Sequence, residues 1–126
     1  MLFRSPGSPE SFAPAVPDAR ALFQVAYGDR TVPNPTSYTL LEAGGLFHRA
    51  SLYRNDRTAS ADKNPHGFLL NPADFLSGFQ QGQAQVAAFL GTGATIDPDG
   101  VGPVWEVPVE RPGVLRRLNF DAPQFD

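Results

Sequence analysis

The chain has 126 residues, of which 41% are hydrophobic, and a formal net charge of −3; this length suits one small domain with a single modest core. The acidic balance and the scattered basic residues argue against nucleic-acid binding, and the absence of cysteine excludes disulfides, thiolate metal sites and a thiol nucleophile. No stretch approaches the roughly 20 apolar residues of a membrane span, and residues 1–4 are too short an apolar start for a secretory signal, so we expect a soluble protein of unknown compartment.

A proline-rich segment opens the chain and predicts an arm or linker over residues 1–20. Each proline disfavours helix for itself and for the residue before it. The segment also contains two PxxP spacings of the kind that aromatic-lined grooves bind, formed by Pro6 with Pro9 and by Pro14 with Pro17. Because such spacings are common in any proline-rich linker, we prefer the linker interpretation.

An apolar run at residues 21–27 predicts a strand that is covered on both faces, as in parallel sheets. Gly28 permits a sharp turn at the carboxyl end of this strand. Asp29 comes next, at the edge where open α/β sheets place their ligands and chemistry. Asp29 is therefore the first candidate functional residue.

A helix and a second strand are predicted next. Asn34 supplies an N-cap and the proline after it suits the first helical turn, which predicts a helix over residues 34–43 that a glycine pair ends. Residues 48–54 predict a strand near the sheet edge, because Ala50 and Leu52 alternate with polar neighbours as if one face were wet. Strand, helix and strand at this spacing predict a βαβ unit with two parallel strands.

A polar loop over residues 55–65 leads to His66 and is of the kind that often carries function. We expect the charged side chains of this loop to be solvated. Asn71 and the proline after it open the longest predicted helix, which Gly91 ends. Apolar residues recur along this helix at helical spacing and predict a face that covers the sheet: Phe75, Phe79, Val86, Phe89 and Leu90.

The pattern then loosens, and residues 92–126 predict an irregular extension. Residues 104–109 form its one predicted strand, which Pro108 would confine to a sheet edge. Residues 115–120 predict a short element that docks on the rest. The chain thus divides into the arm, a core over residues 21–91 and this extension.

No cofactor and no metal site is predicted. His48 and His66 together would need a third donor to hold a metal ion. The segment from Asp97 to Gly100 resembles the opening of a calcium loop, but no glutamate follows at the twelfth position, so a turn is favoured.

Asp29 and His66 are the two residues that the predicted architecture brings together. Each follows one of two parallel strands, and the carboxyl ends of such strands meet at the same edge of a sheet. An aspartate that accepts a hydrogen bond from Nδ1 of a histidine holds the ring in one tautomer and leaves Nε2 to act as a general base. We therefore predict an Asp29–His66 pair at this edge.

Two motifs resemble those of α/β-hydrolases. Residues 28–33, Gly-Asp-Arg-Thr-Val-Pro, look like the acid-bearing turn of that family, and residues 65–68, Pro-His-Gly-Phe, look like its histidine loop. The order of elements over residues 21–91 is similar to the end of that fold, with the closest likeness to large bacterial esterases and lipases. The resemblance implies an α/β fold with a partial hydrolase-type parallel sheet of two to three strands, a crossover helix and a C-terminal covering helix. It also implies that Asp29 is the acid and His66 the base of a Ser-His-Asp triad that acts on carboxylic esters.

The nucleophile of that family is missing from the sequence. Its serine lies on a G-x-S-x-G turn upstream of the acid, and no serine of this chain has glycines two residues to either side. The resemblance therefore implies the C-terminal part of an ester hydrolase, inactive alone, whose partner is an upstream half that carries the serine and whose substrate is a small ester. The alternative is a non-catalytic interaction module that self-associates through an exposed sheet edge.

Overall fold

The computed structural model describes residues 11, 13–15, 20–100 and 102–118. The strands are β1 (Phe23–Ala26), β2 (Ala50–Tyr53) and β3 (Trp105–Glu106). The α-helices of the described residues are α2 (Asn34–Gly44), α3 (Leu76–Thr92) and α4 (Pro112–Arg117). Short 3-10 turns are η1 (Ala13–Ala15), η2 (Phe47–Arg49), η3 (Asn55–Arg57) and η4 (Phe68–Leu70). Within the described ranges, no helix has the length and apolar character needed to cross a membrane.

The three strands form one mixed sheet in the order β1-β2-β3. β1 and β2 run parallel with α2 between them in the sequence, so the predicted βαβ unit is confirmed. β3 is an edge strand, as predicted for residues 104–109, but it runs antiparallel to β2. The expectation of an all-parallel sheet is therefore wrong, and the fold has mixed α/β character.

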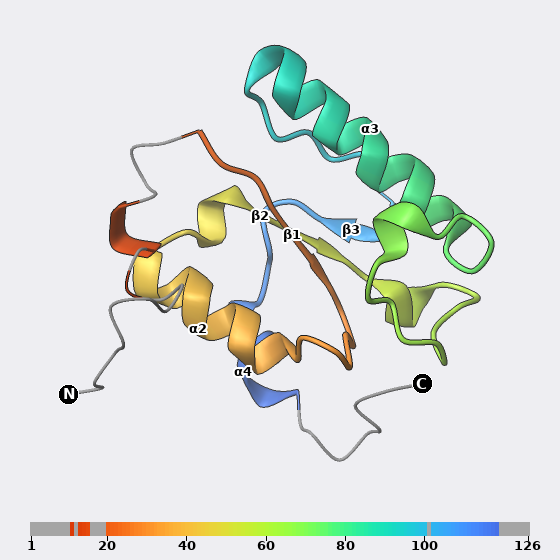
Figure 1. The fold of residues 1–126 in the computed structure, drawn as a ribbon, viewed down its shortest axis with the longest axis horizontal. Helices are drawn as coiled ribbons and strands as arrows, with labels where there is room; N and C mark the ends of the chain where they lie inside the picture. The colour runs from red at the N-terminus through yellow and green to blue at the C-terminus, as the bar shows by residue number, and fades with distance from the viewer. Residues whose placement is uncertain (1–10, 12, 16–19, 101, 119–126) are drawn as a thin grey trace.

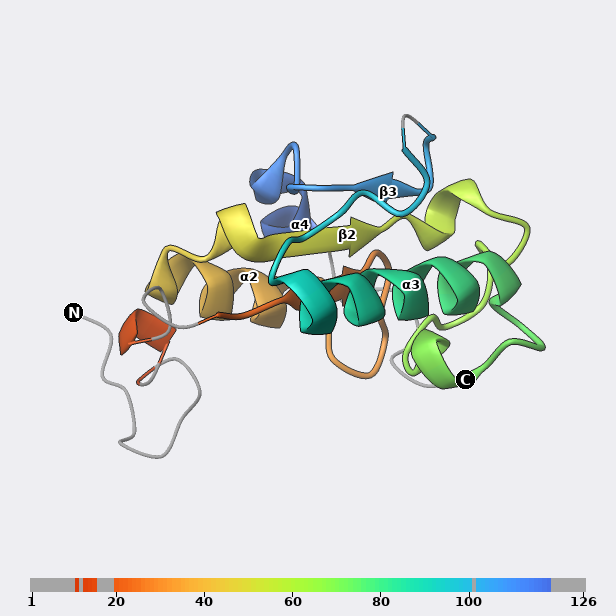
Figure 2. The same cartoon turned by 90° about the horizontal axis from the view of Figure 1, so that it is seen from above.

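Helices cover both faces of this sheet (Figure 1). α2 and α4 lie on one face, and α3 lies on the other. The view from above shows the strands between α3, which is nearest the viewer, and the two shorter helices behind (Figure 2). The small sheet is thus the middle layer of three.

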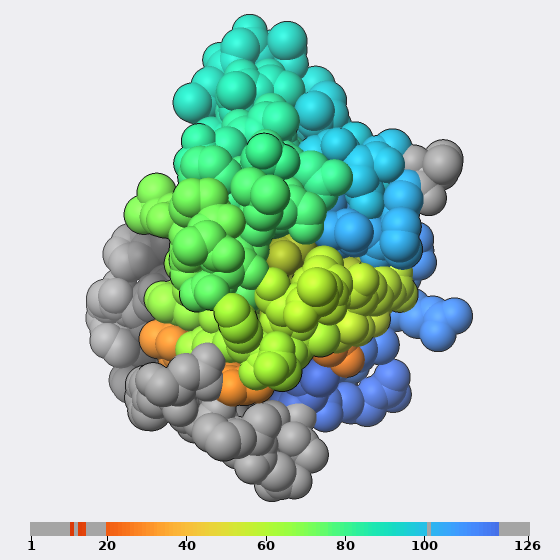
Figure 3. All heavy atoms as spheres, turned by 90° about the vertical axis from the view of Figure 1, so that its right-hand side faces the viewer, coloured from red at the N-terminus to blue at the C-terminus, as the bar shows by residue number. Residues whose placement is uncertain are grey.

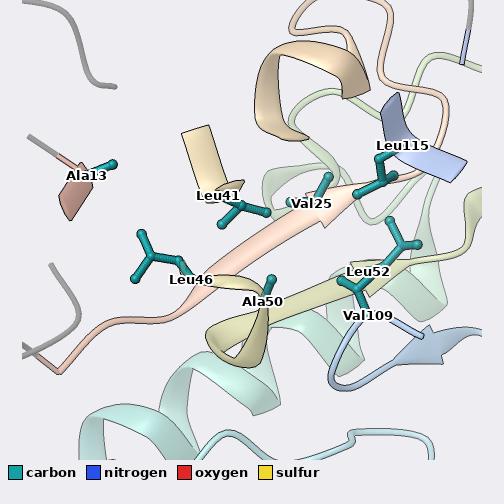
Figure 4. Packing of buried hydrophobic residues seen from close by; sticks show 8 residues of the cluster. All are labelled: Ala13, Val25, Leu41, Leu46, Ala50, Leu52, Val109 and Leu115. Carbon is teal, nitrogen blue, oxygen red and sulfur yellow. The ribbon is translucent and has the colours of Figure 1, made fainter. Parts of the chain in front are cut away.

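Two apolar clusters fill the spaces between these layers. On the side of α2 and α4, strand residues pack with residues of both helices, as Figure 4 shows: Ala13, Val25, Leu41, Leu46, Ala50, Leu52, Val109 and Leu115. On the side of α3, the cluster is mostly aromatic: Ala26, Tyr53, Phe68, Phe75 and Trp105. The strand register explains this division, because Val25 pairs with Leu52 and the next residues along pair with each other on the opposite face.

β2 is the central strand and is buried along its whole length. The prediction of a strand near the edge with one wet face is therefore wrong. Ser51 has the polar side chain that suggested water, yet it is fully buried, and its hydroxyl accepts a hydrogen bond from Nε2 of Gln85 at 2.7 Å. A buried polar residue with a distant partner looks the same in the sequence as a solvated one.

Asn34 is not the N-cap of α2, because Pro33 holds that position. The Asn34 side chain is 2% exposed and faces the end of β1 instead. Its Oδ1 accepts a hydrogen bond from the Gly28 amide at 2.7 Å, and its Nδ2 donates to the Ala26 carbonyl at 2.8 Å. Asn34 thus ties the turn after β1 to the start of α2.

Replacing Asn34 with alanine is expected to lower the free energy of unfolding by about 2 kcal/mol, because it leaves the half-buried Gly28 amide and the buried Ala26 carbonyl without this partner. Urea denaturation measures this loss. Asn71→Ala is the control, since the hydrogen bonds of the Asn71 side chain are to nearby Asp74 in a half-buried turn, and we expect a smaller loss there. Equal losses in the two variants would contradict the role of Asn34.

α3 begins five residues later than predicted, at Leu76. Oδ1 of Asn71 accepts a hydrogen bond from the Asp74 amide at 3.2 Å and closes a turn, so Asn71 starts a turn and not the helix. The helix ends at Thr92, where Gly93 has the left-handed conformation with φ of 77°, so the prediction of an end at Gly91 is wrong by two residues.

Of the apolar residues predicted to face the sheet, Phe75 is buried, in the position just before α3 begins. Within α3 itself the buried positions are two glycines and one glutamine, Gly78, Gly82 and Gln85. Phe79, Val86 and Phe89 are half-buried, and Leu90 is exposed. The two glycines let the helix lie directly on the rings and side chains beneath it, because a Cβ on Gly78 would lie 2.5 Å from the ring of Tyr53.

The predicted arm and C-terminal element lie partly outside the described residues. Of the two PxxP spacings, the first lies wholly outside them and the second is described only at Pro14. Within the arm, Ala13 is buried in the cluster beside α2. The element predicted at residues 115–120 corresponds to α4, which begins earlier, and residues 119 and 120 lie outside the described part.

Candidate active site

Asp29 and His66 meet at the carboxyl edge of the parallel strand pair. Asp29 follows β1 after a turn at Gly28, whose φ of 85° suits glycine. His66 lies in the loop after β2, and its Nδ1–H donates a hydrogen bond to Oδ2 of Asp29 at 3.0 Å. The two side chains that the sequence placed at one edge are therefore in direct contact.

The Asp29 carboxylate is held in place on its other oxygen as well. Oδ1 accepts hydrogen bonds from the backbone amides of Thr31 at 2.8 Å and Val32 at 2.9 Å. The Asp29 side chain is 14% exposed. These two bonds close the loop on itself and leave Oδ2 directed at the histidine.

Asn64 joins the aspartate loop to the histidine loop. Its Oδ1 accepts hydrogen bonds from the Arg30 amide at 3.0 Å and from the His66 amide at 3.3 Å. Its Nδ2 donates to Oγ1 of Thr31 at 3.1 Å. The sequence reasoning missed this residue, and the only signal was an asparagine before a proline in a polar loop.

Asn55 anchors the histidine loop to the end of β2. It is buried, and its Nδ2 donates to the carbonyls of Ser60 at 3.0 Å and Lys63 at 3.2 Å. Its Oδ1 accepts a hydrogen bond from the Tyr53 hydroxyl at 3.3 Å, and burial raises the pKa of Tyr53. The loop that carries His66 is therefore an ordered structure with an internal polar centre.

The charged side chains of the loop over residues 55–65 are exposed, as expected, and some of them form ion pairs. Arg54 pairs with Asp56 at 2.7 Å and with the buried Glu106 of β3. Hydrogen bonding to Asp56 and to Glu106 raises the pKa of Arg54. Lys63 pairs with Asp74 at 2.6 Å on the surface, outside the Asp29–His66 contact.

The imidazole of His66 is accessible. Its side chain is 47% exposed, and it borders a depression of about 200 Å³ that β1 and η4 also line. Figure 3 shows the histidine loop, in yellow-green and green, against the orange segment that follows β1. Because Nδ1 is bound to Asp29, Nε2 is the nitrogen that remains for proton transfer.

The hydroxyls of Ser51 and Ser60 form hydrogen bonds with groups other than His66. Ser51 is buried beneath α3, and the Ser60 hydroxyl donates to the Asp74 carbonyl.

Among the residues that the structure describes, no group of three or more histidines and carboxylates could hold a metal ion. His48 lies in η2 before β2 begins, whereas His66 follows β2, so the two histidines are at opposite ends of the strand.

The segment after α3 that was compared with a calcium loop forms a turn, as favoured. Oδ1 of Asp97 accepts a hydrogen bond from the Asp99 amide at 3.3 Å, and Oδ2 of Asp99 accepts one from the Val104 amide at 2.8 Å. Burial raises the pKa of Asp97, and the neighbouring Asp99 adds to this. Both carboxylates thus accept hydrogen bonds from backbone amides of this segment. The turn lies apart from the Asp29–His66 pair.

Comparisons of the chain with protein-family models, with curated proteins and with solved structures found no match. The Asp29–His66 contact is therefore the feature of the molecule that bears on its function.

Proposed function

We propose that this chain is the C-terminal part of a serine ester hydrolase of the α/β-hydrolase type. In this proposal Asp29 is the acid and His66 the base of a Ser-His-Asp triad. The observation that carries it is the 3.0 Å contact between Nδ1 of His66 and Oδ2 of Asp29. The order in which the chain supplies β1, Asp29, α2, β2, His66 and α3 supports the same assignment.

The chemistry follows from the free nitrogen of the ring. Nε2 of His66 takes the proton of a serine hydroxyl as the oxygen attacks an ester carbonyl, and then gives it to the leaving alcohol. Asp29 stabilises the imidazolium that forms between these steps. The serine and the donors for the oxyanion come from another polypeptide that reaches the depression beside His66.

The test is complementation. The chain alone should not hydrolyse p-nitrophenyl butyrate above the rate in buffer, because it lacks the nucleophile and the oxyanion donors. Mixed with the polypeptide encoded directly upstream, it should produce hydrolysis that His66→Ala removes and His48→Ala leaves unchanged. His48 is the matched control because it is exposed and lies at the opposite end of β2. Hydrolysis that survives His66→Ala, or none in the mixture, would contradict the proposal.

A further inference from the structure

The contact between Asp29 and His66 is one link in a closed circuit of hydrogen bonds that also runs through Thr31 and Asn64. Nδ2 of Asn64 donates to the Thr31 hydroxyl at 3.1 Å, and the Thr31 amide donates to Oδ1 of Asp29 at 2.8 Å. Oδ2 of Asp29 accepts from Nδ1 of His66 at 3.0 Å. The His66 amide donates to Oδ1 of Asn64 at 3.3 Å and closes the circuit.

Both polar atoms of the Asn64 side chain take part in this circuit. Its Oδ1 also accepts a hydrogen bond from the amide of Arg30, the residue after Asp29, at 3.0 Å. Because a backbone amide can only donate, the oxygen of Asn64 must take these two bonds, and its nitrogen is left to face Thr31. One oxygen therefore joins the backbone beside Asp29 to the backbone of His66.

The backbone that carries Asn64 is itself held in place. Pro65 follows it and is fully buried, and the residue before a proline is restricted to extended backbone. The Pro65 carbonyl accepts a hydrogen bond at 3.0 Å from the amide of Phe68, which is buried in the cluster beside α3. Asn64 is therefore a fixed point from which the exposed His66 is positioned.

The Asp29–His66 contact needs such support because it is exposed. The His66 side chain is 47% exposed, and holding two exposed side chains in one geometry costs entropy that offsets most of their attraction. A second bond joins the same two loops, from Nη2 of Arg30 to the Asp62 carbonyl at 2.9 Å, but it ends on neither member of the pair. The bonds of Asn64 fix the backbone on both sides, so less entropy is lost when the pair forms.

We propose that Asn64 is a positioning residue that holds the imidazole of His66 against Asp29 and so keeps the ring proton on Nδ1. A ring released from Asp29 exchanges its proton between Nδ1 and Nε2, because the hydrogen bond at one nitrogen is what selects the tautomer. The consequence for hydrolysis rests on the proposed function. The hold on the ring is a property of this chain alone and is measured there.

The experiment is nitrogen NMR of the histidine rings in the full chain at about pH 9, above the usual titration range of histidine. The chain has two histidines, and the exposed His48 is the internal reference. The ring of His66 should carry its proton mainly on Nδ1. In Asn64→Ala the ratio of the Nδ1-protonated to the Nε2-protonated form should fall by roughly fivefold, the effect of losing one ordinary hydrogen bond.

A second variant opens the circuit on its other side. Thr31→Val keeps the shape of the side chain and removes the hydroxyl that Asn64 binds, so the ratio should fall in the same direction. Thr31→Ser keeps the hydroxyl and should keep the ratio. Asn71→Ala is the matched control, because Asn71 also precedes a proline but its side chain bonds to Asp74. Circular dichroism melts check that each variant is folded.

An unchanged ratio in a folded Asn64→Ala, or in Thr31→Val, would overturn the inference and leave the hydrolase proposal untouched, because Asp29 would then hold the ring without this support. An equal fall in Asn71→Ala would also overturn it. If the ratio falls as expected but the complemented pair does not hydrolyse the ester, the positioning role stands and the hydrolase proposal fails. In an active pair, Asn64→Ala should lower kcat by up to roughly a hundredfold with little change in KM.

Discussion

Replacing Asp29 with asparagine is expected to lower kcat of the complemented hydrolase by about 10⁴-fold, with little change in KM. The asparagine oxygen can still accept the two backbone bonds that Oδ1 of Asp29 accepts now. Its amide nitrogen then faces Nδ1 of His66 and donates to it. The ring is thereby held with its proton on Nε2, where it cannot take the proton of a serine.

The measurement is the rate of p-nitrophenyl butyrate hydrolysis by the complemented pair. Asp62→Asn is the matched control, because Asp62 is an exposed carboxylate in the same loop as His66, and it should leave kcat unchanged. Nitrogen chemical shifts of His66 report the tautomer in the chain alone. Full activity of Asp29→Asn, or an unchanged tautomer, would show that Asp29 does not orient the ring.

Replacing Gly78 with leucine is expected to lower the free energy of unfolding by about 3 kcal/mol or more, which is enough to unfold a marginally stable domain. A Cβ at this position would lie 2.5 Å from Cζ of Tyr53. Tyr53 cannot give way, because it is fully buried and its ring centroid lies 4.7 Å from that of Phe68 and 5.4 Å from that of Trp105. The helix would have to leave the sheet.

Gly91→Leu is the matched control on the same helix. Gly91 is exposed, and a Cβ there meets nothing within 4 Å. The same substitution should raise stability by about 0.5 to 1 kcal/mol, because leucine favours a helix more than glycine does. Thermal and urea melts measure both variants. Similar melts for the two would contradict the close contact between α3 and the sheet.

The close contact of α3 also bears on the candidate site. Phe68 packs on Tyr53 two residues after His66, and a Cβ on Gly82 would lie 2.9 Å from the Phe68 ring. The end of the histidine loop is thus clamped between the sheet and the helix. A change that lifts α3 should therefore loosen His66 as well as lower stability.

The sequence by itself determined the order of the elements and the contact between Asp29 and His66. Parallel strands joined by a crossover helix end at the same sheet edge, so two residues that follow them are brought together whatever the details of packing. This is why a local pattern sufficed for a contact across 37 positions.

Only the tertiary structure decided which face of α3 is buried, that Ser51 lies inside and what Asn34 and Asn64 bind. Periodicity counts apolar side chains, whereas α3 approaches the sheet through Gly78 and Gly82, where the absence of a side chain matters. A polar residue reveals nothing of its partner when that partner is distant, as Gln85 is from Ser51. The antiparallel direction of β3 depends likewise on pairing between segments about fifty residues apart, which no local pattern encodes.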